Sequence, residues 1–229
     1  MMRLFACCIF VLLNHICFGQ NRPLINDPFV GLPVRPSQVR NIDSLNQLPT
    51  RISYIIENLL KTAMTDFVDN IFFIQGQDID LESLAAKDSM FQIDYKYVVP
   101  KYELFFELRD TTIGIKSYCL RLSLDKYGQI LQFDWPRDGF NKRDIFIEPV
   151  VLEKTALRYA KSKKYKTETC LYGFYYDEAR KCLCWHFSYL QKSTGDEFNY
   201  AKKYKTIVVD ALENYVIEEL EMGSVGISD

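Results

Sequence analysis

The stretch from Lys181 to Leu190, KCLCWHFSYL, alternates between large apolar side chains and small or polar ones. A period of two is typical of a β-strand whose two faces meet different surroundings. The apolar set is Leu183, Trp185, Phe187 and Tyr189, and the other set is Cys182, Cys184, His186 and Ser188. We therefore predict a strand that buries its aromatic face in a core and carries most of the nucleophilic or ligand-type side chains of the chain on its other face.

The length and composition of the chain are those of a folded protein. The chain has 229 residues, of which 48% are apolar and 14% aromatic. This length suggests one large domain or two small ones, and the apolar content can fill a substantial core. Intrinsic disorder is therefore not expected.

Residues 1–19 have the pattern of a secretory signal peptide. Arg3 precedes an uncharged apolar run from Leu4 to Leu13, and a polar region then ends in the small residue Gly19. A membrane-spanning helix needs roughly 20 apolar residues, about twice the length of this run. We expect cleavage after Gly19, no membrane insertion of the mature chain, and a location in the periplasm or outside the cell.

Basic and acidic residues nearly balance, with 28 Lys and Arg against 30 Asp and Glu. Such a surface gives no electrostatic reason to expect nucleic acid or an anionic membrane as a partner. We therefore predict neither.

The first half of the mature chain predicts an arm followed by an α+β module. Proline recurs through residues 20–49, which are expected to form an extended arm or linker. Thr50 is expected to cap a helix that keeps apolar spacing to about Phe73. A loop from Gln75 to Asp88, with a short helix from Leu81, should follow. The strands predicted after it are Phe91–Val98, Tyr102–Arg109, Tyr118–Leu124 and Gln129–Trp135, which completes a module over residues 50–136.

The second half repeats this plan over residues 144–222. Pro149 suits the first turn of a helix that runs to about Tyr165. The strands predicted after it are Thr169–Tyr176, Lys181–Leu190, Tyr204–Asp210 and Asn214–Met222, and residues 223–229 should form a loose tail. The expected fold class is α+β, with two tandem modules that each pack a helix on one face of an antiparallel meander.

The last hairpins of the two modules are alike. Asp125 is followed by Gly128, and Asp210 is followed by Asn214, with one extra residue in the second turn. Gly and Asn tolerate the left-handed backbone that such turns need. These similarities favour an internal duplication.

The second half, about residues 146–222, also resembles the PepSY domain family. The resemblance lies in the helix Pro149–Tyr165, in the strand centred on Trp185-His186-Phe187, and in Ile207 to Ala211 followed by Asn214-Tyr215-Val216, with Asn214 where the family usually has Gly. Members of this family are small α+β modules of exported or membrane-associated proteins, and some are thought to restrain secreted peptidases. In outline, tandem modules of this kind are also similar to secreted inhibitors of β-lactamases. The resemblance implies a binding or inhibitory role and carries no catalytic residues.

Four cysteines remain after the predicted signal peptide: Cys119, Cys170, Cys182 and Cys184. Two residues that stand two apart on one strand face are normally too distant to bridge, so Cys182 and Cys184 are not expected to pair with each other. Cys170, on the neighbouring strand, is the preferred disulfide partner for one of them.

The face that carries Cys182, Cys184 and His186 raises an alternative to a binding role. These side chains, with Cys170 as a further ligand, would suit zinc, or a Cys and His pair could serve a small hydrolase. The mature chain has no second His and no CxxC motif, so we predict no metal, no cofactor and no catalytic residue. A purely structural envelope component is a third interpretation.

Four aromatic side chains crowd both faces of the strand before this one: Tyr172, Phe174, Tyr175 and Tyr176. A single-layer sheet cannot bury both of its faces, and Tyr is favoured where a large contact is half wet. We predict a partner-binding surface here. The expected function is therefore that of an exported, non-enzymatic protein that binds a protein or peptide and inhibits a secreted or envelope enzyme.

Overall fold

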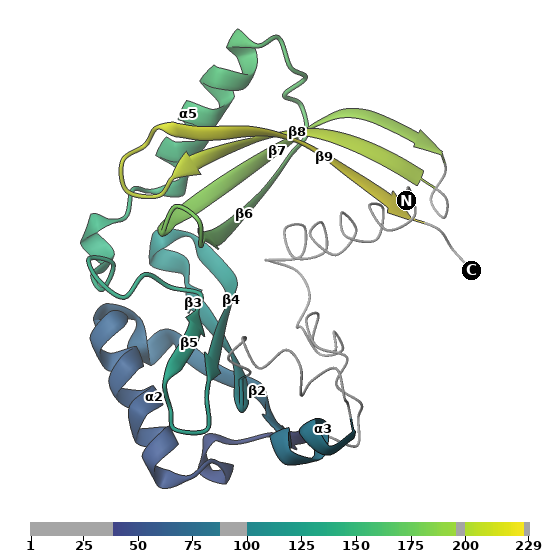
Figure 1. Cartoon of the computed structure of the whole chain (residues 1–229). Coiled ribbons are helices and arrows are strands. Elements are labelled where there is room, and N and C mark those ends of the chain that lie inside the picture. The colour runs from purple at the N-terminus through teal and green to yellow at the C-terminus, as the bar shows by residue number, and fades with distance from the viewer. Residues whose placement is uncertain (1–38, 88–99, 196–199, 227–229) are drawn as a thin grey trace. The chain divides into compact units, whose positions relative to one another are not determined.

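The computed structural model describes residues 39–87, 100–195 and 200–226 (Figure 1). They form a five-stranded antiparallel sheet in the order β1-β2-β3-β4-β5 and a four-stranded antiparallel sheet in the order β6-β7-β8-β9. The predicted α+β fold with two modules is confirmed. The signal peptide, residues 20–38 of the arm and the strand predicted at Phe91–Val98 lie outside the described residues.

The described residues divide into two compact units. The first unit comprises 39–87, 100–110 and 117–143, and the second comprises 111–116, 144–195 and 200–226. The modules were predicted to cover 50–136 and 144–222, which leaves 137–143 between them. The chain passes from the first unit to the second at the end of this segment, between Arg143 and Asp144. Residues 111–116, which were expected in the first module, group with the second unit.

In chain order, the elements up to the end of the first sheet are β1 (Val39–Ile42), η2 (Leu45–Gln47), α2 (Thr50–Ala63), η3 (Thr65–Asn70), β2 (Ile71–Ile79), α3 (Leu81–Lys87), β3 (Tyr102–Asp110), η4 (Thr111–Ile113), β4 (Ile115–Leu124) and β5 (Ile130–Phe133). α2 lies beside the sheet in Figure 1. Its buried side chains follow one stripe of the helix: Ile52, Ile56, Leu60 and Ala63. The apolar spacing of the sequence predicted this stripe.

The predicted end of this helix was wrong. α2 stops at Ala63, and the residues expected to continue it form η3 and then β2. β2 pairs with both β1 and β3, and its first residues are the β-branched and aromatic Ile71, Phe72 and Phe73. The pairing of these three residues with β3 outweighs the helical spacing, because strand preference depends on neighbours that are distant in sequence. Thr50 is the first helical residue, and its side chain does not cap the helix.

Two further expectations for this region were wrong. The predicted arm contains β1, in which Ile42 lies opposite Gly76 of β2 and is fully buried. The predicted loop from Gln75 belongs to β2 as far as Ile79, whereas the short helix expected from Leu81 is present as α3. A strand of four residues that needs a distant partner gives little local signal.

The first unit has its own aromatic core around Trp135. The indole is buried, and its ring centroid lies 5.4 Å from that of Phe67 and 6.2 Å from that of Tyr118. On β3, the carboxylate of Glu103 is also buried and accepts hydrogen bonds from Arg121 at 2.8 Å and Ser123 at 3.2 Å. Burial raises the pKa of Glu103, although its bond to Arg121 opposes that rise.

The chain then passes through η5 (Arg143–Ile145) into α5 (Pro149–Ser162), β6 (Cys170–Asp177), β7 (Cys182–Gly195), β8 (Tyr200–Asp210) and β9 (Val216–Gly226). All four strands predicted in the second half are present. β9 continues to Gly226, so the first residues of the predicted tail are part of the sheet, and 227–229 lie outside the described residues.

The matching hairpins follow the predicted turn chemistry. Oδ1 of Asp125 accepts hydrogen bonds from two backbone N–H groups of its turn, and Oδ1 of Asp210 does the same in the second unit. Gly128 has a φ of +87° and Asn214 a φ of +54°, so both adopt the expected left-handed backbone. A common origin of the two halves stays a prediction.

None of the helices in the described part of the chain combines the length and the apolar content that a membrane crossing requires.

Candidate functional site

The register of the second sheet assigns its side chains to two faces. Phe187 lies opposite Tyr172 of β6 and Ile207 of β8, and Ile207 lies opposite Glu219 of β9. The hydroxyl of Tyr159 on α5 donates a hydrogen bond to Glu219, so α5 covers the face to which these residues belong. We call it the helix face. The opposite face, which carries Cys182, Cys184, His186 and Ser188, is called the thiol face.

The helix face holds the core that the alternation of β7 predicted. Leu183, Trp185, Phe187 and Tyr189 are all buried there. The ring of Trp185 lies 5.3 Å from that of Phe174 and 6.2 Å from that of Tyr172. Leu152, Ala156 and Ala160 of α5 are also fully buried.

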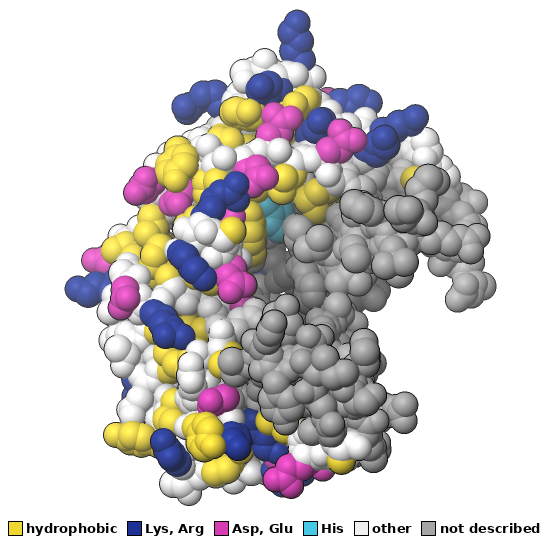
Figure 2. Space-filling view, in the orientation of Figure 1, with side chains coloured by type: hydrophobic (Ala, Val, Ile, Leu, Met, Phe, Trp, Pro, Cys, Tyr) yellow, Lys and Arg dark blue, Asp and Glu magenta, His cyan; other side chains and the backbone are white. Residues whose placement is uncertain are grey.

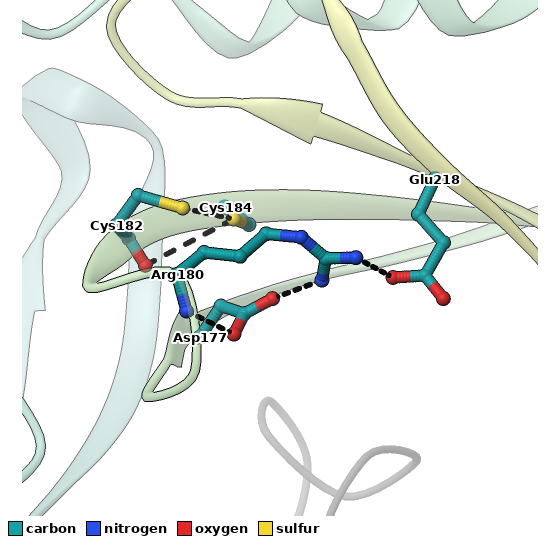
Figure 3. Close-up of polar contacts among 5 residues, drawn as sticks. All are labelled: Asp177, Arg180, Cys182, Cys184 and Glu218. Atoms are coloured by element: carbon teal, nitrogen blue, oxygen red, sulfur yellow. Dashed lines mark hydrogen bonds and ion pairs between the residues drawn. The ribbon is translucent and has the colours of Figure 1, made fainter.

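On the thiol face, the sulfur atoms of Cys182 and Cys184 are 3.5 Å apart (Figure 3). The two side chains therefore lie closer together than the spacing of a strand suggests, but they form no disulfide bond, and both are free thiols. Cys184 is fully buried, and Cys182 is partly exposed at the start of β7. Lys181, just before it, has a left-handed backbone with a φ of +56°, so the chain turns sharply into Cys182.

The prediction that Cys170 bridges to Cys182 or Cys184 was wrong. Cys170 is on the neighbouring strand, as predicted, but it lies opposite Tyr189 on the helix face. Cys182 and Cys184 lie opposite Asp177 and Tyr175 on the thiol face. A bond from Cys170 to either of them would have to pass through the sheet, and all four described cysteines are free thiols.

Arg180, in the turn between β6 and β7, crosses the thiol face beside the two sulfurs (Figure 3). Its Nη1 lies 2.5 Å from Oδ2 of Asp177 on β6, and its Nη2 lies 2.7 Å from Oε2 of Glu218 on β9. Its backbone N–H also donates to Oδ1 of Asp177 at 3.0 Å. Burial alone would raise the pKa of Asp177, but the hydrogen bonds from Arg180 outweigh it and lower that pKa.

Both thiols are held in the neutral form. Burial raises the pKa of Cys184, and the neighbouring thiol of Cys182 raises it further. Burial also raises the pKa of Cys182, while its hydrogen bond with Cys184 and, to a smaller extent, the guanidinium of Arg180 oppose that rise. A thiolate is the reactive and metal-binding form of cysteine, so either thiol must lose its proton before it reacts.

His186 is a buried, neutral imidazole. His186 is 7% exposed, and its Nδ1 atom has no hydrogen-bond partner among the described residues. The ring lies across the backbone of Gly173, so close that a Cβ built there would be 2.4 Å from Cε1 of the ring. Burial lowers the pKa of His186 to about 4. Within the part of the chain that the structure describes, no three His, Cys, Asp or Glu side chains gather as ligands for a metal ion.

The depressed pKa of His186 predicts a loss of stability in mild acid. Between pH 6.5, where the unfolded imidazole titrates, and pH 4, the unfolded chain binds a proton that the folded chain excludes. The neutral ring therefore contributes its full stability above pH 6.5. This contribution falls as the pH falls from 6.5 to 4 and does not change further below pH 4. The total loss in the free energy of unfolding is on the order of 3 kcal/mol. We expect urea titrations to show a smaller loss over this window for His186→Gln than for the wild-type protein. Parallel curves would contradict the assignment.

The four aromatic residues of β6 do not form the single surface that was expected. Phe174 is 2% exposed and lies opposite Trp185, so it belongs to the core and not to a binding surface. Tyr172 is 43% exposed, and Tyr175 and Tyr176 are partly buried. Sequence reasoning missed Leu171, which is 53% exposed on the thiol face. The sequence does contain a signal for this residue, because Leu171 is apolar and falls on the strand face that the predicted helix does not cover.

β6 is an edge strand, because the order of its sheet places β7 on one side only. The carbonyl of Thr169 accepts a hydrogen bond from Leu190 of β7 at 3.0 Å. In an antiparallel ladder, alternate residues direct their backbone groups to the same side. Leu171 and Gly173 therefore bond toward β7, and the N–H and C=O of Tyr172 are directed away from it.

Comparison of the chain with models of known protein families, with curated proteins and with solved structures found no significant match in any of the three.

Proposed function

We propose that this protein is a non-enzymatic binding module that takes up an extended segment of another protein as an added strand beside β6. The observation that carries this proposal is the pair Leu171 and Tyr172. Both are large, apolar and about half exposed, and they lie next to each other on an edge strand. Because neighbouring side chains point to opposite faces of a sheet, the pair offers one contact on each face of an incoming strand.

The other sheet edges are poorer candidates. β1 and β5 have four residues each, whereas β6 has eight. β9 carries three glutamates, Glu218, Glu219 and Glu221. Short strands and charged side chains are the usual ways in which proteins protect an edge from pairing. β6 has no charged residue from Cys170 to Tyr176, which favours an uncharged, apolar segment as its occupant.

Tyr172 is held in place before any partner binds. Its ring lies 6.2 Å from that of Trp185, and Nζ of Lys116 lies 5.9 Å from its ring centroid. A side chain that is already fixed loses little freedom on binding, which favours affinity. On the face shown in Figure 2, basic and acidic side chains are interspersed, which suits a protein partner better than nucleic acid.

The cellular setting of this binding is part of the same proposal. The signal pattern of residues 1–19 supports export, and the resemblance of residues 146–222 to the PepSY family is the reason to propose inhibition of a secreted or envelope enzyme. Expression in a bacterial host with its own N-terminus should yield a chain that starts at Gln20, as read by mass spectrometry of the intact protein. A chain that retains residues 1–19 would contradict export.

The binding mode is tested with a displayed library of random octapeptides. We expect the wild-type protein to select uncharged peptides rich in β-branched and aromatic residues. Tyr172→Pro should abolish selection, because it removes the N–H group directed away from β7 and leaves the ladder bonds to β7 intact. Tyr172→Ala is the matched control, since it loses the same side chain but keeps the N–H group, and it should retain weaker selection of the same peptides.

Three results would contradict this binding mode. The first is selection that is equal in Tyr172→Pro and wild type, and the second is a loss that is as complete in Tyr172→Ala as in Tyr172→Pro. The third is self-association through this edge in the absence of peptide, which light scattering would show as twice the monomer mass. Circular dichroism spectra of both variants establish that they fold.

A further inference from the structure

The positions of Cys182 and Cys184 in the ladder leave one of the two free to move. Cys184 pairs with Tyr175 on one side and with Asp210 on the other. Within the described ladder, Cys182 pairs with Asp177 alone, and it is the first residue of its strand. The sulfurs are 3.5 Å apart, about 1.5 Å more than the length of a disulfide bond. A small shift of Cys182 at the strand end can close that gap without breaking the pairing of Cys184.

The two thiols differ in access. Cys182 is partly exposed and has the guanidinium of Arg180 nearby, whereas Cys184 has no exposed surface. A reagent from solution therefore meets Cys182 first. Cys184 is placed to act second, because its sulfur already lies against that of Cys182.

We propose that Cys182 and Cys184 are a redox pair that closes into a disulfide within strand β7 when the protein meets a disulfide oxidant. Cys182 gives up its proton, and its thiolate attacks one sulfur of the oxidant, which forms a mixed disulfide and expels one thiolate. Cys184 then gives up its proton and attacks Sγ of Cys182, which forms the Cys182–Cys184 bond and expels the second thiolate. The expelled thiolates take up the two protons, so the protein loses two hydrogens and the oxidant is reduced to two thiols.

Oxidised glutathione is the probe that tests this pair. The folded full-length protein is incubated with it, remaining thiols are alkylated with iodoacetamide, and tryptic peptides are weighed. Cleavage after Arg180 and Lys181 places Cys170 in the peptide 167–180 and both Cys182 and Cys184 in the peptide 182–192. We expect the peptide 182–192 to be unalkylated and lighter by two hydrogens, and Cys119 and Cys170 to be alkylated.

Each other outcome overturns the proposal. A cross-link between peptides 167–180 and 182–192 would mean that Cys170 is the partner. Alkylation of both Cys182 and Cys184 would mean that the pair is inert, and a glutathione adduct that persists on Cys182 would mean that Cys184 cannot displace it.

Single variants separate the two roles. Cys184→Ala should trap the glutathione adduct on Cys182, and Cys182→Ala should leave Cys184 without an adduct, because that sulfur is buried. Cys170→Ala is the matched control and should form the disulfide as the wild-type protein does. Adduct formation on Cys184 in Cys182→Ala that is as fast as adduct formation on Cys182 in Cys184→Ala would contradict the assigned order.

Discussion

Replacement of Trp185 by alanine is expected to destabilise the second unit by about 3–5 kcal/mol, the usual cost of removing a buried tryptophan from a packed core. Trp185 is 1% exposed on the helix face, and its ring lies close to those of Phe174 and Tyr172. The surrounding side chains relax only partly into the space that the indole leaves, so the cost of the remaining cavity adds to the lost free energy of burying the indole. Urea titration gives the total loss, and amide hydrogen exchange locates it. Exchange should accelerate along β7 and β8 and stay unchanged along β3 and β4.

Trp135→Ala is the matched variant in the first unit. Trp135 is equally buried and contacts Phe67 and Tyr118. We expect the opposite pattern, with faster exchange along β3 and β4 and no change along β7 and β8. Equal acceleration in both sheets for either variant would contradict the assignment of a separate core to each unit.

Gly173→Ala is expected to destabilise the protein by about 1–3 kcal/mol, the usual cost of overpacking. The sign is informative, because replacing glycine by alanine in a strand generally stabilises by a few tenths to about 1 kcal/mol. At this position a Cβ would lie 2.4 Å from Cε1 and 2.7 Å from Nε2 of His186. Gly223→Ala in β9 is the control, since among the described residues its Cβ would meet only the carbonyl of Lys202 at 3.6 Å, an ordinary contact.

A double-mutant cycle with His186→Ala tests the physical reason for that loss. When the imidazole is absent, the alanine at 173 has room, so the cost of Gly173→Ala should fall below 1 kcal/mol or change sign. Free energies of unfolding from urea titrations give the four corners of the cycle. The same cost in both backgrounds would mean that the ring of His186 does not limit the space at Gly173.

The features predicted correctly are those that local sequence determines. Alternation in β7 assigned Trp185 to a core and the cysteines to the opposite face, because the period of a strand is fixed by the backbone. The Asp210 turn was recognisable because Asn214 is one of the few residue types that accept its backbone conformation.

The features that were missed depend on distant partners. β1 forms a strand because it pairs with the last residues of β2, and the first residues of β2 form a strand because they pair with β3. Phe174 and Tyr172 look alike in sequence and each lies opposite a buried aromatic residue on the same face, but Phe174 is buried, whereas Tyr172 remains half exposed. The sulfurs of Cys182 and Cys184 are in contact just after Lys181, whose left-handed backbone is a conformation for which lysine gives no signal.

Hydrogen exchange at single amides of β6, followed by NMR, tests most directly whether this edge accepts an added strand. In the free protein, the N–H of Tyr172 should exchange rapidly, while those of Leu171 and Gly173, which bond toward β7, should exchange slowly. With a library-selected octapeptide bound, exchange at Tyr172 should slow by roughly tenfold or more. A Tyr172 N–H that is as well protected in the free protein as its two neighbours, or that the peptide leaves unchanged, would contradict the proposed binding edge.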